Sequence, residues 1–170
     1  IASNESPIEA SSLVQTELNL LEQWLIRWKI NIYTEKSNHI TFSLRRGECP
    51  PLYINGYEIP KTNTVKYLGM HLDKRLTWQK HIKAKKEHLK IKTKKMYWLL
   101  GPKSSLSLAN KLKLYKSILK PVWTYGVQLW GTSSNSNVEI LQRYQSQTLR
   151  TIANAPWFVT NRKIHEDFNI

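Results

Sequence analysis

The sequence predicts an α+β fold, in which one helix and a small antiparallel sheet are followed by a run of helices. Apolar residues recur at helical spacing near the start and through the second half of the chain. Short segments flanked by turn residues lie between these two regions. The 170 residues are 41% hydrophobic, with seven Trp and eight Tyr, a composition that excludes a disordered basic tail.

The first expected element is an amphipathic helix over residues 7–29. Ser6 can accept a hydrogen bond at its N-terminus, Pro7 suits the first turn, and Glu9 stands three residues after the cap. We expect this helix to pack on a sheet through an apolar face, formed by Val14, Leu18, Leu21, Leu25 and Trp28.

Three β elements are expected next. His39–Leu44 has the alternation of a strand, and residues 52–59 contain the turn pair Asn55-Gly56, which predicts a hairpin. Residues 65–72 predict a further strand that Gly69 interrupts. A glycine weakens a strand unless a bulge or a close backbone approach requires it.

The second half predicts helices. Residues 78–100 form one periodic segment, which Gly101-Pro102 should end. Later helix starts are indicated by the capping residues Ser107, Ser136 and Thr160. The helix after Ser107 is expected to end before Pro121.

The positive charge is confined to one block. The chain has 26 Lys and Arg against 12 Asp and Glu, a net charge of +14, and residues 74–120 hold 15 of the basic residues but only one acidic residue, Glu87. Such a block predicts a polyanionic partner, and nucleic acid is the obvious one. A face that merely keeps the protein in solution is the alternative, although such surfaces usually mix both signs. The candidate nucleic-acid-binding residues are Lys80, Lys83, Lys86, Lys90 and Lys94.

Aromatic residues at the ends of the basic helix allow two interpretations. Trp78, Tyr97 and Trp98 could stack on the bases of single-stranded or hybrid nucleic acid. Alternatively, these rings belong to the core.

Other functional classes find little support. No apolar run reaches the length of about 18 residues that a membrane helix needs, so no membrane partner is expected. The single Cys49 excludes a disulfide scaffold and indicates a reducing compartment. Glu166 and Asp167 are the only adjacent acidic residues, and we predict no metal site and no cofactor in this chain.

Several segments resemble reverse transcriptases of non-LTR retrotransposons. Trp28–Ile30, Ile32–Ser37 and Ile40–Ser43 resemble motif D of this family. Val65–Asp73, continuing into Leu76-Thr77-Trp78, is similar to motif E, the primer grip. The later segments Ser117–Gly126, Leu129–Thr132 and Ala155–Phe158 resemble the post-catalytic region of jockey-like elements of insects.

The resemblance implies a right-handed polymerase with fingers, palm and thumb. Residues 1–77 would then be the C-terminal part of the palm, and residues 78–170 a helical thumb and post-thumb segment. We expect the catalytic aspartates to lie upstream of Ile1, so that the chain is a fragment that is inactive by itself. The implied partners are an RNA template, a DNA primer, and the fingers and catalytic palm of the same polypeptide, with Mg²⁺ in the intact enzyme. The expected setting is an intracellular ribonucleoprotein in nucleus and cytoplasm.

The resemblance also implies residue roles. Lys36 matches the motif D lysine, proposed to be the general acid that protonates the leaving pyrophosphate. Tyr33 stands where the family usually has Asn, a departure that affects this loop. Tyr67, Leu68, Gly69 and Met70 match the primer grip. The alternative function is a non-catalytic nucleic-acid-binding module from a truncated or domesticated element, and a weaker one is a protein-interaction domain.

Overall fold

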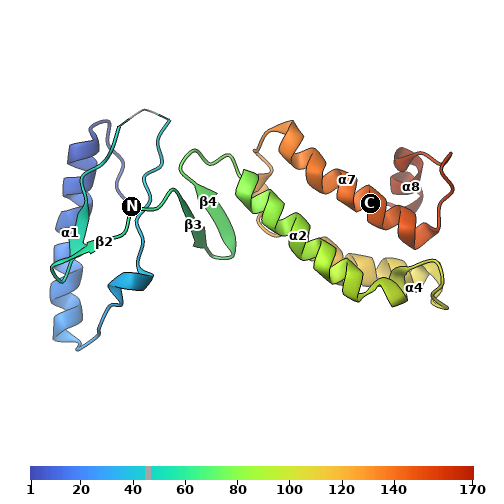
Figure 1. The fold of residues 1–170 in the computed structure, drawn as a ribbon, viewed down its shortest axis with the longest axis horizontal. Helices are drawn as coiled ribbons and strands as arrows, with labels where there is room; N and C mark the ends of the chain where they lie inside the picture. Colours follow the sequence, from blue (N-terminus) through green and yellow to red (C-terminus); the bar gives the residue numbers. More distant parts are fainter. Residues whose placement is uncertain (45–46) are drawn as a thin grey trace. The chain divides into compact units, whose positions relative to one another are not determined.

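The computed structural model describes residues 1–44 and 47–170, with only the backbone at Thr34. The chain divides into two compact units, Ile1–Leu76 (unit 1) and Thr77–Ile170 (unit 2). Unit 1 holds one long helix and two separate two-stranded antiparallel sheets, and unit 2 is helical in its described residues. The predicted α+β class is therefore confirmed (Figure 1).

Unit 1 is built on helix α1, which spans Pro7–Arg27. Ser6 caps it as predicted, because its hydroxyl accepts a hydrogen bond from the Glu9 amide at 3.5 Å. The hairpin around Asn55-Gly56 is also confirmed, with β1 (Leu52–Ile54) antiparallel to β2 (Tyr57–Ile59). In Figure 1 this hairpin lies along α1. The small core between them contains Leu52, Ile54 and Ile59, packed against Val14, Leu18 and Ile32.

The predicted single strand over residues 65–72 is wrong, because this segment is a second hairpin. Strand β3 (Thr64–Tyr67) turns back through Leu68 and Gly69 into β4 (Met70–Asp73). Leu68 has φ 46° and Gly69 has φ 77°, the left-handed pair that a two-residue hairpin turn requires. Gly69 is therefore a turn residue and does not interrupt a strand.

The predicted strand His39–Leu44 is also wrong. His39 makes one isolated bridge with Lys61, through hydrogen bonds to the Pro60 carbonyl and from the Thr62 amide. Toward residue 37 the parallel ladder would need a donor at position 60, and Pro60 has no amide hydrogen. Toward residue 41 the neighbouring segment enters β3 at Thr64, which pairs with β4. The ladder therefore stops after one bridge. The short 3-10 turn η1 (Thr34–Lys36) precedes this segment.

Unit 2 begins with helix α2 (Gln79–Lys95), followed after Met96 by the short α3 (Tyr97–Leu100). The predicted helix 78–100 is thus present with one interruption. Ser107 caps α4 (Leu108–Leu114) as predicted, and its hydroxyl accepts from the Asn110 amide at 3.4 Å.

The expected helix end before Pro121 is wrong. The backbone continues from α4 through a π-helical turn, η2 (Tyr115–Leu119), into α5 (Lys120–Thr124). A proline inside an α-helix lacks a hydrogen-bond donor and clashes with the carbonyl four residues earlier. The wider turn, in which the Lys120 amide donates to the Tyr115 carbonyl, lets the helix pass Pro121.

The remaining helices are α6 (Val127–Trp130), α7 (Asn135–Ala153) and α8 (Asn161–Phe168). α7 starts after Ser134, two residues before the predicted cap Ser136, whereas Thr160 caps α8 as predicted. In Figure 1, α2 and α7 run side by side in the same direction, and residues 108–124 return along them. Within the described ranges, no helix combines the length and apolar character needed to cross a membrane.

Candidate nucleic-acid interface

Helix α2 has one buried face and one charged face. Trp78 at its start, and then His81, Ile82, Lys85 and Leu89, are buried. At about 100° per residue these positions lie together on one side. The opposite side is exposed and carries all five lysines predicted to bind nucleic acid; we call it the basic face, formed by Lys80, Lys83, Lys86, Lys90 and Lys94.

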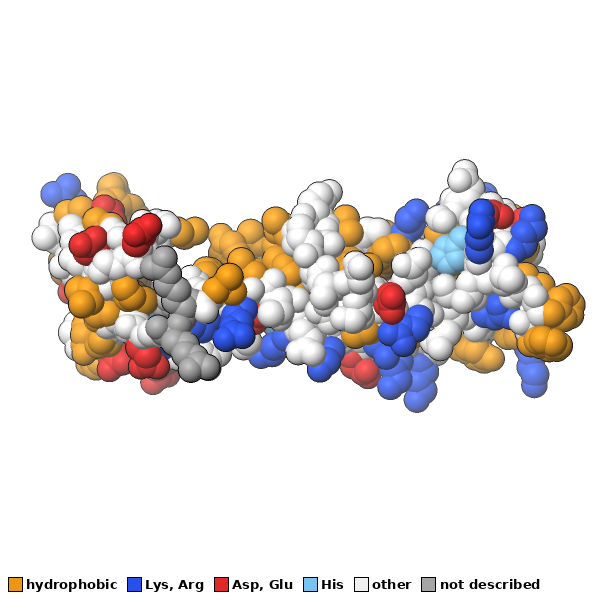
Figure 2. Space-filling view, turned by 90° about the horizontal axis from the view of Figure 1, so that it is seen from above, with side chains coloured by type: hydrophobic (Ala, Val, Ile, Leu, Met, Phe, Trp, Pro, Cys, Tyr) orange, Lys and Arg blue, Asp and Glu red, His pale blue; other side chains and the backbone are white. Residues whose placement is uncertain are grey.

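The electrostatics of the basic face are almost uniformly positive. Glu87 is the one acidic residue of α2, and it lies 3.8 Å from the Lys90 ammonium. Both side chains are more than half exposed, so this pair contributes little stability and leaves Lys90 able to contact other anions. Figure 2 shows Lys and Arg side chains gathered over the helical unit on the face it presents.

Two lysines of the basic block are buried instead. The Lys85 ammonium donates to the Val122 carbonyl at 2.8 Å and lies 5.3 Å from the centre of the Tyr125 ring. Burial lowers the pKa of Lys85 to about 8. Lys111 donates to the Gly101 carbonyl at 2.8 Å. These two side chains join segments of unit 2, so their contacts are structural.

The burial of Lys85 could have been found in the sequence. It follows Ile82 by three residues and precedes Leu89 by four, which is the spacing of the apolar face. The basic composition of the segment concealed this position.

Of the aromatic residues at the ends of α2, one belongs to the core and two are exposed and could stack on bases. Trp78 is 6% exposed and belongs to the core, so it cannot stack on a base. Tyr97 and Trp98 are 55% and 73% exposed, and their rings are accessible beside the C-terminal end of the basic face.

Lys36 lies in unit 1 at the end of the η1 turn and is exposed. Its ammonium is 5.2 Å from the centre of the Tyr33 ring, a distance typical of a cation–π contact. Tyr33, the residue that departs from the family pattern, is therefore in contact with the Lys36 side chain.

The four residues that resemble a primer grip lie at the tip of the β3–β4 hairpin. Tyr67 and Leu68 are 61% and 66% exposed, whereas Met70 is buried. Leu68 adopts a left-handed conformation, which costs about 1–2 kcal/mol for a residue other than glycine. The turn therefore presents an apolar side chain to solvent on a strained backbone.

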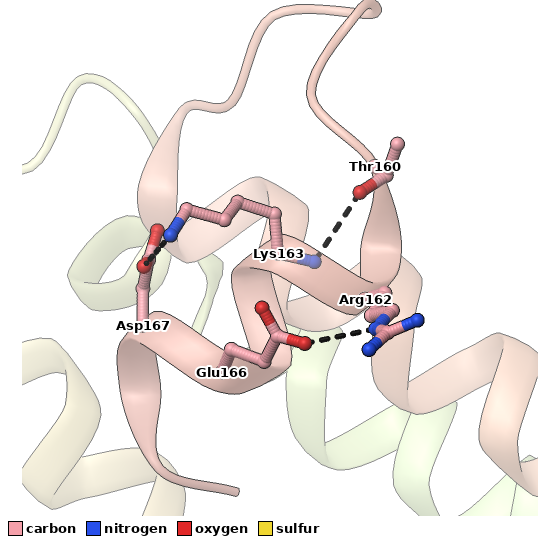
Figure 3. Close-up of polar contacts among 5 residues, drawn as sticks. All are labelled: Thr160, Arg162, Lys163, Glu166 and Asp167. Carbon is pink, nitrogen blue, oxygen red and sulfur yellow. Dashed lines mark hydrogen bonds and ion pairs between the residues drawn. The ribbon is translucent and has the colours of Figure 1, made fainter.

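The acidic residues do not fit a metal centre. Among the residues that the structure describes, no group of three or more His, Cys, Asp or Glu side chains is placed to hold a metal ion. Glu166 and Asp167 instead pair with Arg162 at 2.8 Å and Lys163 at 3.0 Å along α8 (Figure 3).

Comparison with known proteins identifies homologues of the chain. The chain is 41% identical over 162 residues to the probable RNA-directed DNA polymerase from transposon X-element of Drosophila melanogaster, covering 95% of the chain and 18% of that protein. It is 36% identical over 170 residues to the RNA-directed DNA polymerase from mobile element jockey of the same species, covering 100% of the chain and 19% of the relative. The probable RNA-directed DNA polymerase from transposon BS is 32% identical over 164 residues, or 95% of the chain and 18% of the relative.

The chain is homologous to RNA-directed DNA polymerases of non-LTR transposons. The resemblance seen in the sequence is thus confirmed. The homologous segment spans less than one fifth of the length of these polymerases. No family model and no solved structure matches the chain.

Proposed function

We propose that this chain is the part of an RNA-directed DNA polymerase that holds the template–primer duplex during DNA synthesis. The observation that carries the proposal is the basic face of α2, where five exposed lysines stand opposite the buried side of the helix. Homology to transposon polymerases supports the same partner.

The dimensions of α2 suit a duplex backbone. Its 17 residues extend about 26 Å at the rise of an α-helix. A double helix carries roughly one negative charge per 1.7 Å of axis, so several phosphates come within reach of the five ammonium groups. Contacts of this kind hold a duplex in place without reading its sequence.

Two features of unit 1 would act in the same synthesis. We infer that the tip of the β3–β4 hairpin, Tyr67 to Met70, contacts the primer strand. Lys36 would be the general acid that donates a proton to the pyrophosphate as it leaves. Its ammonium is exposed and lies 5.2 Å from the centre of the Tyr33 ring, which supports this role because a proton donor must be open to its acceptor.

The reaction also requires Mg²⁺ in the intact polymerase. Because the described acidic side chains do not form a metal site, we propose that the metal is held by other parts of the polymerase.

The basic face is tested by the salt dependence of binding. Replacing Lys83 and Lys90 with Ala should weaken binding to an RNA–DNA hybrid of any sequence. Each phosphate contact that is lost should reduce the slope of log affinity against log salt by about 1. Fluorescence anisotropy of a labelled hybrid, titrated over a series of KCl concentrations, measures both quantities.

A matched control removes two positive charges elsewhere. Arg27 and Lys29 are exposed in unit 1, outside the basic face. Their double replacement with Ala should leave the slope within error of wild type. If both double variants lose the same slope, net charge governs binding and the assignment to α2 is wrong.

A further inference from the structure

Two aromatic rings project from the loop between α7 and α8. Trp157 is 90% exposed and Phe158 is 67% exposed. The rings meet edge to face, with centroids 6.0 Å apart and planes inclined at 83°. Two exposed rings in contact form a contiguous apolar patch, a feature that often marks an interaction site.

The loop that carries these rings is held by Arg150 of α7. The guanidinium donates to the Val159 carbonyl at 2.6 Å and to the Pro156 carbonyl at 2.7 Å. It also donates to the side-chain oxygen of Asn161, the first residue of α8, at 3.2 Å. The backbone on both sides of the rings is therefore held, so the loop itself loses little entropy on binding.

A polar groove lies between the same two helices. Its volume is about 620 Å³, and its walls include Gln142, Arg143 and Ser146 from α7 together with Asn161, Arg162 and His165 from α8. The His165 ring nitrogen Nε2 is 3.1 Å from the Ser146 hydroxyl. Asn161 connects the two features, since it lines the groove and bonds the arginine that holds the loop.

Both arginines of the groove can exchange partners. Arg143 pairs with Glu139 at 3.7 Å, and Arg162 with Glu166 at 2.8 Å (Figure 3). All four side chains are more than half exposed, and exposed pairs of this kind contribute at most about 1 kcal/mol. A phosphate can therefore displace the carboxylates.

We propose that Trp157, Phe158 and the α7–α8 groove form a second nucleic-acid site, which binds unpaired nucleotides of a single strand. The rings offer faces on which bases stack. The arginines take the phosphates, and the amide groups of Gln142 and Asn161 can bond base edges. A duplex offers phosphates to the arginines, but its bases are already stacked and paired and are closed to the rings and the amide groups.

Charge favours nucleic acid over a protein partner. Residues 77–170 contain 17 Lys and Arg but only four Asp and Glu, an excess that attracts a polyanion. The groove is also lined mainly by hydrogen-bonding side chains, which suit phosphates and base edges.

The test compares two probes with the full 170-residue chain: a short unstructured RNA and an RNA–DNA hybrid of equal length, both fluorescently labelled. Replacing Trp157 and Phe158 together with Ala should lower the affinity for the single strand at least tenfold. It should leave the affinity for the hybrid unchanged. The double replacement with Tyr keeps two stacking rings and should bind almost as wild type.

Two further variants test the role of the arginines and control for the loss of an exposed ring. Arg143→Gln with Arg162→Gln should reduce the salt slope more for the single strand, which the rings hold at the groove, than for the hybrid. Trp24→Ala removes an exposed Trp from unit 1 and should change neither affinity. Loss of Lys83 and Lys90 affects the hybrid, so failure of this proposal is distinct from failure of the duplex proposal.

Three results would overturn the second site. One is wild-type affinity of the Trp157 and Phe158 double Ala variant for the single strand. Another is an equal loss for both probes. The third is unchanged RNA binding together with self-association of the wild-type chain that this variant abolishes in sedimentation, which would make the rings a protein contact.

Discussion

At the scale of single residues, Lys85 links packing to pH. Its buried ammonium bonds the Val122 carbonyl, and burial lowers its pKa from 10.5 to about 8. Between about pH 8 and pH 10 the unfolded chain keeps a proton that the folded chain has released. The free energy of unfolding therefore rises with pH in this window.

We predict that the rise disappears in Lys85→Met. The wild-type chain should gain roughly 1–2 kcal/mol between pH 8 and pH 10, after a discount for partial hydration of the ammonium. Urea unfolding at several pH values measures it. Lys86→Met, at the exposed neighbouring position, should keep the wild-type slope, and a flat wild-type profile would contradict the assignment. Above pH 10 the opposite sign is expected, because burial raises the pKa of Tyr115.

The charged side of α2 could be predicted from the positions of its lysines in the sequence. The five lysines of the basic face share one side of a helical repeat, and a helix with a buried stripe leaves that side in water. Sequence alone could not assign Trp78 and Trp98, since a ring suits both a core and a base stack. Their exposures, 6% and 73%, follow from packing.

At the scale of elements, the two hairpins of unit 1 form a natural comparison. Asn55 and Leu68 each occupy the first position of a left-handed turn that continues with Gly. Asparagine tolerates this conformation, and leucine does not. The first hairpin was predictable from its turn pair, whereas the second was missed because Leu-Gly is not a typical turn sequence.

We predict that Leu68→Asn stabilises the β3–β4 hairpin by about 1 kcal/mol. The reciprocal change, Asn55→Leu, should destabilise the β1–β2 hairpin by a similar amount. Hydrogen exchange of the strand amides separates the two effects. If Leu68→Asn also weakens hybrid binding, the strained leucine has been kept for contact with nucleic acid. A destabilised β3–β4 hairpin in this variant would show that the leucine conformation is not strained.

Tertiary context also explains the two other wrong predictions, the strand at His39–Leu44 and the helix end before Pro121. His39–Leu44 has the alternation of a strand, but a strand exists only where a partner supplies a ladder, and the segment beside it pairs with β4 from Thr64 onward. The continuation of a helix through Pro121 depends on the π-helical turn, for which the sequence carries no simple signal.

At the scale of the whole molecule, charge and candidate chemistry separate between the units. Residues 1–73 hold seven basic and eight acidic side chains, whereas the positive excess lies in the following block. Lys36 and the primer-grip residues belong to unit 1, and the basic face belongs to unit 2. Affinity for a polyanion and proton transfer would thus be properties of different units.

We predict that the isolated chain binds a primed template but does not extend the primer. Its described acidic residues do not form a cluster that could bind a metal ion, and DNA synthesis by the two-metal mechanism needs such a cluster. The measurement is a primer-extension assay with Mg²⁺ and all four deoxynucleotides, run beside binding of the same labelled substrate. Primer-extension activity that copurifies with the wild-type chain and is absent from a mock preparation would refute the prediction.

The π-helical turn at Tyr115–Leu119 has a consequence for how related chains can vary. Lys111, Tyr115 and Leu119 follow one another at four-residue steps and are all buried. In an α-helix each such step rotates the side chain by about 40° around the helix axis. The wider π-helical turn rotates less per residue, so the three side chains stay closer to one side of the helix. A homologue with one residue fewer here would need a regular α-helix, a residue other than proline at 121, and a rotated set of core positions. Among homologues, a deletion at this point should therefore occur together with substitutions at the core positions that face this helix.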